Sequence, residues 1–80
     1  MTPTVNFGDK TYDTRYGGPF DRGTADSYYH RLDRPHYYVG ATSASAKIEK
    51  QDMTPEEIDA YHAGYAWNEY NGDKKDYGSF

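Results

Sequence analysis

The feature that most constrains the fold is that most of the apolar surface must come from aromatic rings and little from aliphatic side chains. The chain has ten tyrosines, three phenylalanines and one tryptophan, but only five residues of the Val, Leu or Ile type. A tyrosine ring buries a large area, while its hydroxyl needs a hydrogen-bonding partner or water. A chain of 80 residues forms one domain and buries only about 60% of its unfolded surface. We therefore predict a single shallow core of aromatic rings whose edges reach the surface.

The clearest local signal is the segment Thr54–Glu57, which reads Thr-Pro-Glu-Glu. This is a capping box with proline at the first helical position, because the Thr54 hydroxyl and the Glu57 carboxylate can each accept a hydrogen bond from the other residue's backbone N–H. It predicts a helix over about 55–70, with Asn71-Gly72 as the stop.

This helix has two apolar sides. One side carries Ile58, Tyr61 and Tyr65, and the opposite side carries Ala60, Ala63, Gly64 and Trp67. Such a helix lies between two layers or offers one side to a partner. Since the side with Ile58, Tyr61 and Tyr65 is the more apolar, we expect that side to be buried and Trp67 to be more exposed than Tyr65.

A first helix is predicted over about 19–31. Gly17-Gly18-Pro19 breaks the chain before it, and Pro35 ends it because the residue before proline avoids helical angles. Residues 36–39 are aromatic and β-branched, and residues 46–50 alternate apolar and charged, so an extended segment or short hairpin is expected between the helices. Residues 1–17 show no periodicity and are interpreted as a flexible arm before one domain at 18–80. The predicted class is small and mainly α.

A weak internal repeat relates the two helices. The matched positions are Phe20, Gly23, Ala25 and Tyr29 in the first copy, and Tyr61, Gly64, Ala66 and Tyr70 in the second. A glycine inside a helix costs about 1 kcal/mol and usually has a packing reason. We therefore predict that the helices cross at Gly23 and Gly64. Chance matching of frequent tyrosines is the alternative explanation.

Two resemblances bear on function. The chain has an aromatic-x-x-Gly pattern followed by a basic, proline-bearing turn at residues 31–37. This combination resembles the small bacterial ribosome modulation factor group. The likeness implies binding to ribosomal RNA. The strings Tyr16–Gly23, Ala25–Tyr29 and Gly72–Gly78 look more like short uncharacterised proteins encoded by tailed phages. That likeness implies an accessory factor that binds and modulates, for example inhibits, the host machinery.

The residues offer no catalytic constellation. There is no cysteine, no Gly-x-Ser-x-Gly string and no phosphate-cradling glycine loop. The histidines lack the i, i+4 spacing of a helical metal site. We expect no enzyme activity, no metal and no cofactor. With no cysteine, no signal peptide and no long apolar run, a cytoplasmic protein without a membrane partner is expected.

Binding is the remaining class of function. Tyrosine, tryptophan and arginine are enriched at interface hot spots, so a host protein is the first expected partner, and a second copy of the chain is another. The alternative is RNA, single-stranded DNA or the ribosome, bound by arginines interleaved with tyrosines. The candidate partner-binding residues are Trp67, Tyr70, Arg22, Arg31, Arg34 and Tyr37.

Overall fold

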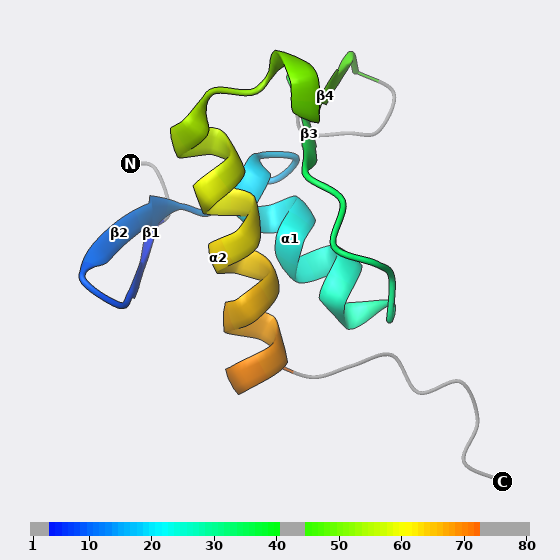
Figure 1. Cartoon of the computed structure of the whole chain (residues 1–80). Helices are drawn as coiled ribbons and strands as arrows, with labels where there is room; N and C mark the ends of the chain where they lie inside the picture. The colour runs from blue at the N-terminus through cyan, green and yellow to red at the C-terminus, as the bar shows by residue number, and fades with distance from the viewer. Residues whose placement is uncertain (1–3, 41–44, 73–80) are drawn as a thin grey trace, which may run out of the picture.

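The computed structural model describes residues 4–40 and 45–72. Its elements are β1 (Thr4–Phe7), β2 (Lys10–Asp13), α1 (Pro19–Tyr28), β3 (His36–Tyr38), β4 (Lys47–Glu49), the 3-10 helix η1 (Lys50–Asp52) and α2 (Pro55–Asn71). Helix accounts for 46% and strand for 22% of these residues, so the expected mainly α class is wrong and the fold mixes α and β. The expected layout of two helices with a short hairpin between them is confirmed (Figure 1).

α1 and α2 cross at two glycines. A methyl group on Gly23 would collide with the carbonyl oxygen of Tyr61 and lie 2.7 Å from the amide nitrogen of Tyr65. A methyl group on Gly64 would collide with the carbonyl oxygen of Phe20. Phe20 and Tyr61 hold the same position in the two copies of the repeat, so the contact is reciprocal. The predicted close crossing at Gly23 and Gly64 is confirmed.

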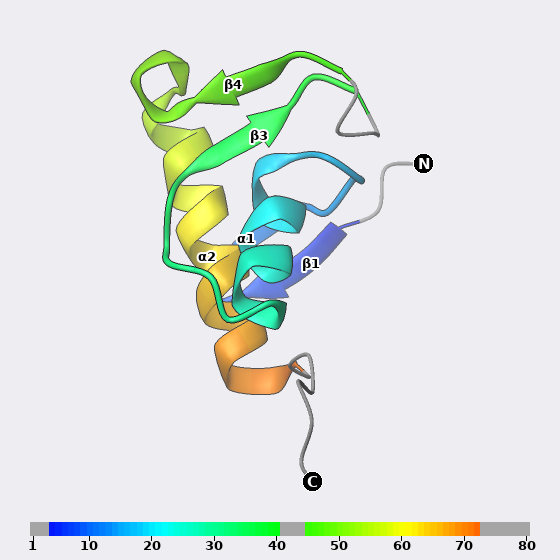
Figure 2. The ribbon, with the colours of Figure 1, turned by 90° about the vertical axis from the view of Figure 1, so that its right-hand side faces the viewer.

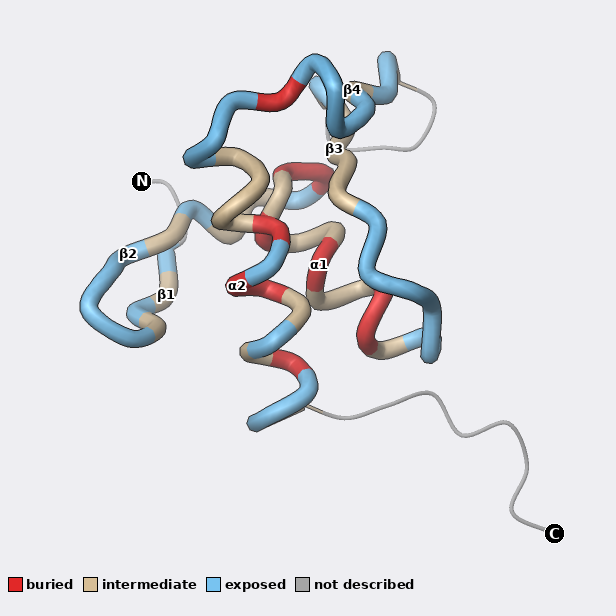
Figure 3. Tube along the Cα trace, viewed as in Figure 1, coloured by how far each residue is buried: buried red, intermediate tan, exposed pale blue. Residues whose placement is uncertain are grey.

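The core lies at this crossing and is small (Figure 3). Tyr61 is fully buried and Phe20 is 2% exposed. The rings of Tyr12, Phe20 and Trp67 form a row that joins β2, α1 and α2, with centroid separations of 5.5 and 6.1 Å. Trp67 and Tyr65 are both half-buried. The expected contrast between an exposed Trp67 and a buried Tyr65 is therefore absent, because α2 is partly covered on both apolar sides.

The helix α1 ends three residues earlier than expected, at Tyr28. His30 adopts a left-handed conformation with φ of 60°. The N–H of His30 donates to the Ser27 carbonyl at 3.1 Å, and the N–H of Arg31 donates to the Asp26 carbonyl at 2.7 Å. This pair of bonds is a Schellman motif, which satisfies the last helical carbonyls and turns the chain away from the helix axis. Arg31 therefore lies beyond the helix, not in its last turn.

The chain after α1 is fastened to α2. Three hydrogen bonds hold it: the Arg34 N–H donates to the Tyr61 hydroxyl at 3.1 Å, the Tyr65 hydroxyl donates to the Arg31 carbonyl at 2.5 Å, and His62 Nδ1 lies 2.8 Å from the Asp33 carboxylate. These bonds fix the position of the main chain that carries Arg31 and Arg34.

The strands β3 and β4 pair antiparallel, with His36 opposite Glu49 and Tyr38 opposite Lys47. Alternation along a strand and pairing across it put these four side chains on one face of the hairpin. The Tyr38 N–H donates to the Gly17 carbonyl at 2.7 Å, which anchors β3 just before α1. Figure 2 shows the hairpin lying beyond the N-terminal end of α1. Residues 41–44, between the two strands, lie outside the described residues.

An additional hairpin, β1–β2, occupies part of the segment interpreted as a flexible arm. Gly8 has φ of 65° at its two-residue turn, the position where this kind of turn favours glycine. The Tyr12 hydroxyl donates to Asp59 of α2 at 2.8 Å, and Lys10 forms an ion pair with the same carboxylate at 3.1 Å. The hairpin is thereby docked on α2.

The predicted capping box is present at the start of α2. The Glu57 N–H donates to the Thr54 hydroxyl at 3.1 Å, and the Thr54 N–H donates to the Glu57 carboxylate at 2.8 Å. In residues 4–40 and 45–72, neither helix has the length and apolar character needed to span a bilayer.

Candidate functional site

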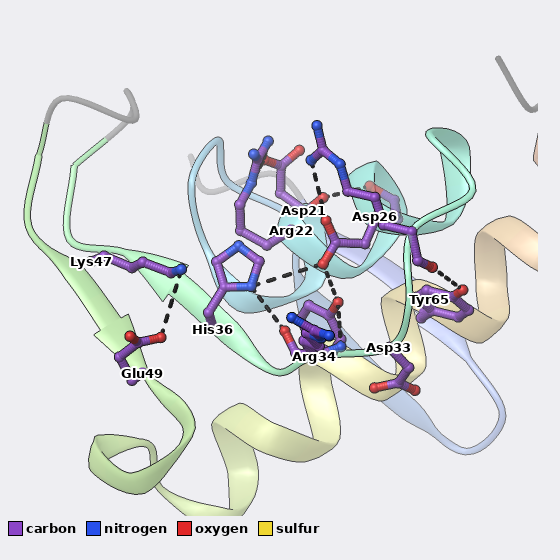
Figure 4. A network of polar contacts seen from close by, with 12 residues as sticks. Asp21, Arg22, Asp26, Asp33, Arg34, His36, Lys47, Glu49 and Tyr65 are labelled. Carbon is purple, nitrogen blue, oxygen red and sulfur yellow. Dashed lines mark hydrogen bonds and ion pairs between the residues drawn. The ribbon is translucent and has the colours of Figure 1, made fainter. Parts of the chain in front are cut away.

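The most distinctive surface feature is a cleft of about 450 Å³ between the outer side of α1, the segment after it and hairpin β3–β4. Its lining residues are Arg22, Asp26, Arg31, Leu32, Arg34, His36, Tyr38 and Lys47. Four of these eight side chains are cationic and one is a carboxylate. Figure 4 shows cleft residues from these three parts of the chain arranged around His36. We call this feature the cationic cleft.

The carboxylate in the cationic cleft belongs to Asp26, which is 4% exposed. The Tyr61 hydroxyl donates a hydrogen bond to it, and Arg31 pairs with it at 3.4 Å. His36 Nδ1 lies 3.8 Å from the same carboxylate and 2.9 Å from the Arg34 carbonyl oxygen. Because a carbonyl oxygen only accepts, Nδ1 carries the ring proton in this arrangement. Asp26 is thus already supplied with donors from the protein.

Tyr61 keeps its proton in this network. Burial of the ring raises the pKa of its hydroxyl above the ordinary value of 10.0, and the hydrogen bond to Asp26 raises it further. A neutral hydroxyl can donate to Asp26 and accept from the Arg34 N–H at once. Tyr61 therefore ties the floor of the cleft to the arginine-bearing segment.

The four cations of the cleft differ in how they are paired. Arg22 pairs with Asp21 at 2.8 Å, and Lys47 pairs with Glu49 at 3.6 Å. The guanidinium of Arg34 makes no ion pair with any residue in 4–40 or 45–72. Even with the carboxylates that pair with Arg22 and Lys47 counted, cations outnumber anions around the cleft, four to three.

Two of the arginines lie over tyrosine rings. The Arg31 guanidinium carbon is 4.9 Å from the centroid of Tyr29, and that of Arg22 is 5.9 Å from the centroid of Tyr38. Such cation–π contacts orient the guanidinium while its edge N–H groups stay available. Each contact also occupies one ring face on which a base could stack.

A second depression is a shallow groove of about 590 Å³ along α2, more apolar than the cleft. Its lining residues are Phe7, Asp33, His62, Tyr65, Ala66, Glu69 and Tyr70. Tyr70 is 85% exposed there. We call this feature the α2 groove.

The structure brings together half of the predicted binding residues. Arg22, Arg31 and Arg34 share the cationic cleft. Tyr70 lies in the α2 groove, and Trp67 packs against Phe20 instead.

The remaining predicted residue, Tyr37, is separate from the cleft. It lies on the opposite face of β3 from His36 and Tyr38, paired with Ile48.

Sequence reasoning did not place Lys47 at the site. The alternation at residues 46–50 indicated that Lys47 and Glu49 share one face of a strand. The register that sets Lys47 opposite Tyr38 was not predicted, and it decides that this face meets the arginines.

Within the described parts of the chain, no three His, Asp or Glu side chains come together in a group that could hold a metal ion. Comparisons of the chain with protein-family models, with curated proteins and with solved structures found no match. The geometry of the cleft and the groove is therefore what bears on function.

Proposed function

We propose that this chain is a small non-enzymatic accessory protein, of the kind that tailed phages encode, which binds and modulates a host protein through the cationic cleft. One observation carries the proposal. Arg22, Arg31, Arg34 and Lys47 come from three separate parts of the chain and line one cleft. Like charges held together in this way repel one another, so an anionic group that enters the cleft is favoured.

The single carboxylate in the cleft does not remove this preference. Asp26 is buried, already accepts a hydrogen bond from Tyr61 and forms an ion pair with Arg31. The Arg31 side chain is 59% exposed, and Arg34 has no ion-pair partner among the described residues. Both guanidinium groups can therefore donate to a carboxylate or phosphate, which Arg binds through two parallel hydrogen bonds.

A protein partner is favoured over a nucleic acid for two reasons. An arginine lies over one face of Tyr29 and another over one face of Tyr38, which leaves less ring surface for bases to stack on. The chain also has a net charge of −4, which opposes a long polyanion. The α2 groove with exposed Tyr70 adds apolar and aromatic surface, typical of a protein interface.

RNA or single-stranded DNA is the second candidate, and the clustered arginines are the observation in its favour. Each phosphate contact releases counterions, so binding of this kind falls steeply as salt rises.

The test is affinity capture from a lysate of a bacterial host, with the captured protein identified by mass spectrometry and its binding repeated with purified components. Two substitutions probe the cleft: Arg34→Gln and Lys47→Gln. Lys50→Gln is the matched control, since Lys50 is exposed and lies three residues from Lys47 but outside the cleft.

We expect a partner whose binding weakens with Arg34→Gln and Lys47→Gln and is unchanged with Lys50→Gln. Equal capture by all four chains would show that the cleft is not the binding surface. Binding of a labelled oligonucleotide that weakens with both cleft variants and with salt, in the absence of a protein partner, would support the second candidate instead.

A further inference from the structure

We infer that the cationic cleft is a subsite for a phosphomonoester on the partner protein, that is, a phosphorylated serine, threonine or tyrosine. The inference rests on the proposed function and names the chemical group that the cleft receives. It goes beyond a general preference for acidic proteins, because it distinguishes a phosphoryl group from a carboxylate.

The number of cations is the first argument. A carboxylate carries one charge, whereas a phosphomonoester carries about −1.5 to −2 near neutral pH and presents three strong acceptor oxygens. The cleft offers three guanidinium groups and one ammonium group around a single space. Arg22, Arg31 and Lys47 are each already paired with one carboxylate, so the excess is one positive charge. What favours a phosphoryl group over a carboxylate is therefore the number of charged N–H donors that surround one space, because three acceptor oxygens can bond to donors on several sides.

Pre-organisation is the second argument. Arg22 is held by the Asp21 carboxylate at 2.8 Å, and Arg31 lies over Tyr29. The main chain at Arg34 is held by the hydrogen bond from its N–H to the Tyr61 hydroxyl, which positions the segment that carries this side chain. Donors held in place before binding lose little conformational freedom when the anion arrives.

The size of the cleft is the third argument. A volume of about 450 Å³ lies within the range of about 300–1,000 Å³ that is usual for ligand sites. It accommodates a phosphoryl group with the side chain that carries it. Internal phosphates of a nucleic acid strand carry one charge each and are spread along the strand. They therefore make less use of cations gathered at one point.

The experiment titrates the full chain with three probes by calorimetry and by NMR. The probes are the capped tripeptides Ala-phosphoserine-Ala, Ala-Ser-Ala and Ala-Glu-Ala. We expect the phosphorylated peptide to bind saturably. The glutamate peptide should bind at least about tenfold more weakly and the serine peptide not measurably, because hydrogen bonds between charged groups dominate the contact.

The same variants locate the site. We expect Arg34→Gln to weaken binding of the phosphopeptide by about tenfold, the effect of losing one charge-assisted hydrogen bond. Lys47→Gln should weaken it too, and Lys50→Gln should leave it unchanged. The Arg34 side chain has no ion pair within the described residues, so an unchanged unfolding curve is expected and serves as the folding control.

Four outcomes overturn the inference, and they separate it from the proposed function. Equal affinity for the phosphorylated and glutamate peptides, or no binding of either, refutes the phosphoryl subsite. If capture of a protein still depends on Arg34 and Lys47, the proposed function then stands alone. Phosphopeptide binding that is insensitive to both variants places the group elsewhere. A 5′-phosphorylated oligonucleotide that binds more tightly than the phosphopeptide, with the same variant dependence, assigns the cleft to nucleic acid ends.

Discussion

The hydroxyl of Tyr61 in α2 donates a hydrogen bond to the carboxylate of Asp26 in α1, at a sequence separation of 35 residues. Both residues are buried: Tyr61 is 0% exposed and Asp26 is 4% exposed. A buried carboxylate left without its donor costs free energy that is not recovered elsewhere. This bond therefore couples the packing of the two helices to the floor of the cationic cleft.

The first prediction concerns this bond. Tyr61→Phe keeps the ring but removes the donor to Asp26 and the acceptor for the Arg34 N–H. We expect the free energy of unfolding to fall by about 1–3 kcal/mol, measured by urea denaturation. The matched control is Tyr70→Phe, because Tyr70 is 85% exposed, and it should leave stability unchanged. Equal stability of both variants would mean that the Asp26 carboxylate finds other donors.

The second prediction concerns the helix crossing. Helix propensity alone predicts that Gly23→Ala and Gly64→Ala stabilise the protein by up to about 1 kcal/mol. Each methyl group would collide with a backbone carbonyl of the opposite helix. Overpacking of this kind costs about 1–3 kcal/mol, so both variants should be less stable in thermal unfolding. The sign of the change decides between the two effects.

The third prediction concerns the capping box. Thr54→Ala removes the hydroxyl that accepts from the Glu57 N–H and should lower the free energy of unfolding by about 1 kcal/mol. Thr54→Ser keeps the acceptor and should retain most of the stability. If alanine and serine behaved alike in thermal unfolding, the hydroxyl would not contribute.

The fourth prediction concerns acid. The hydrogen bond from Tyr12, and then the bond from Lys10, hold the pKa of Asp59 below its ordinary value of 3.8. A carboxyl whose pKa is lower in the folded chain favours folding above the unfolded-state pKa. That contribution is lost as the pH falls through the folded-state pKa.

As the pH falls below the ordinary aspartate value of about 4 and through the lower folded-state pKa of Asp59, we therefore expect hairpin β1–β2 to lose its polar contacts with α2 and to loosen. The NMR signals of residues 10–13 report this step. In Asp59→Asn the same signals should show no such acid transition. A transition that persists in this variant would assign it to another carboxyl group.

The sequence predicted the parts of the fold that depend on local chemistry. The capping box at Thr54 fixes the start of α2, and the repeated glycines indicated the crossing. The end of α1 was placed too late because His30 adopts the left-handed conformation that is usually taken by glycine. Hairpin β1–β2 was missed, although Gly8-Asp9 is a recognised two-residue turn, because only Val5, Phe7 and Tyr12 mark its strands.

The arginines of the candidate site could be predicted from the sequence, but the position of Lys47 could not. Arg22, Arg31 and Arg34 are close in sequence, so their grouping could be anticipated. Lys47 joins them through the register of β3 and β4. A short pair of strands has no long hydrophobic pattern to specify such a register, so it is decided by tertiary contacts such as the bond from Tyr38 to Gly17.

The crossing at Gly23 and Gly64 has a consequence for how this sequence can change over time. There the two main chains touch directly, so the contact does not depend on any matched pair of side chains. Neighbouring apolar side chains can change as long as the total volume is kept, since cores accept volume-conserving replacements, whereas Tyr61 is also constrained by the bond from its hydroxyl to Asp26. The two glycine positions accept almost none. A lineage descended from this chain would thus keep its helix pair by conserving two residues that have no side chains.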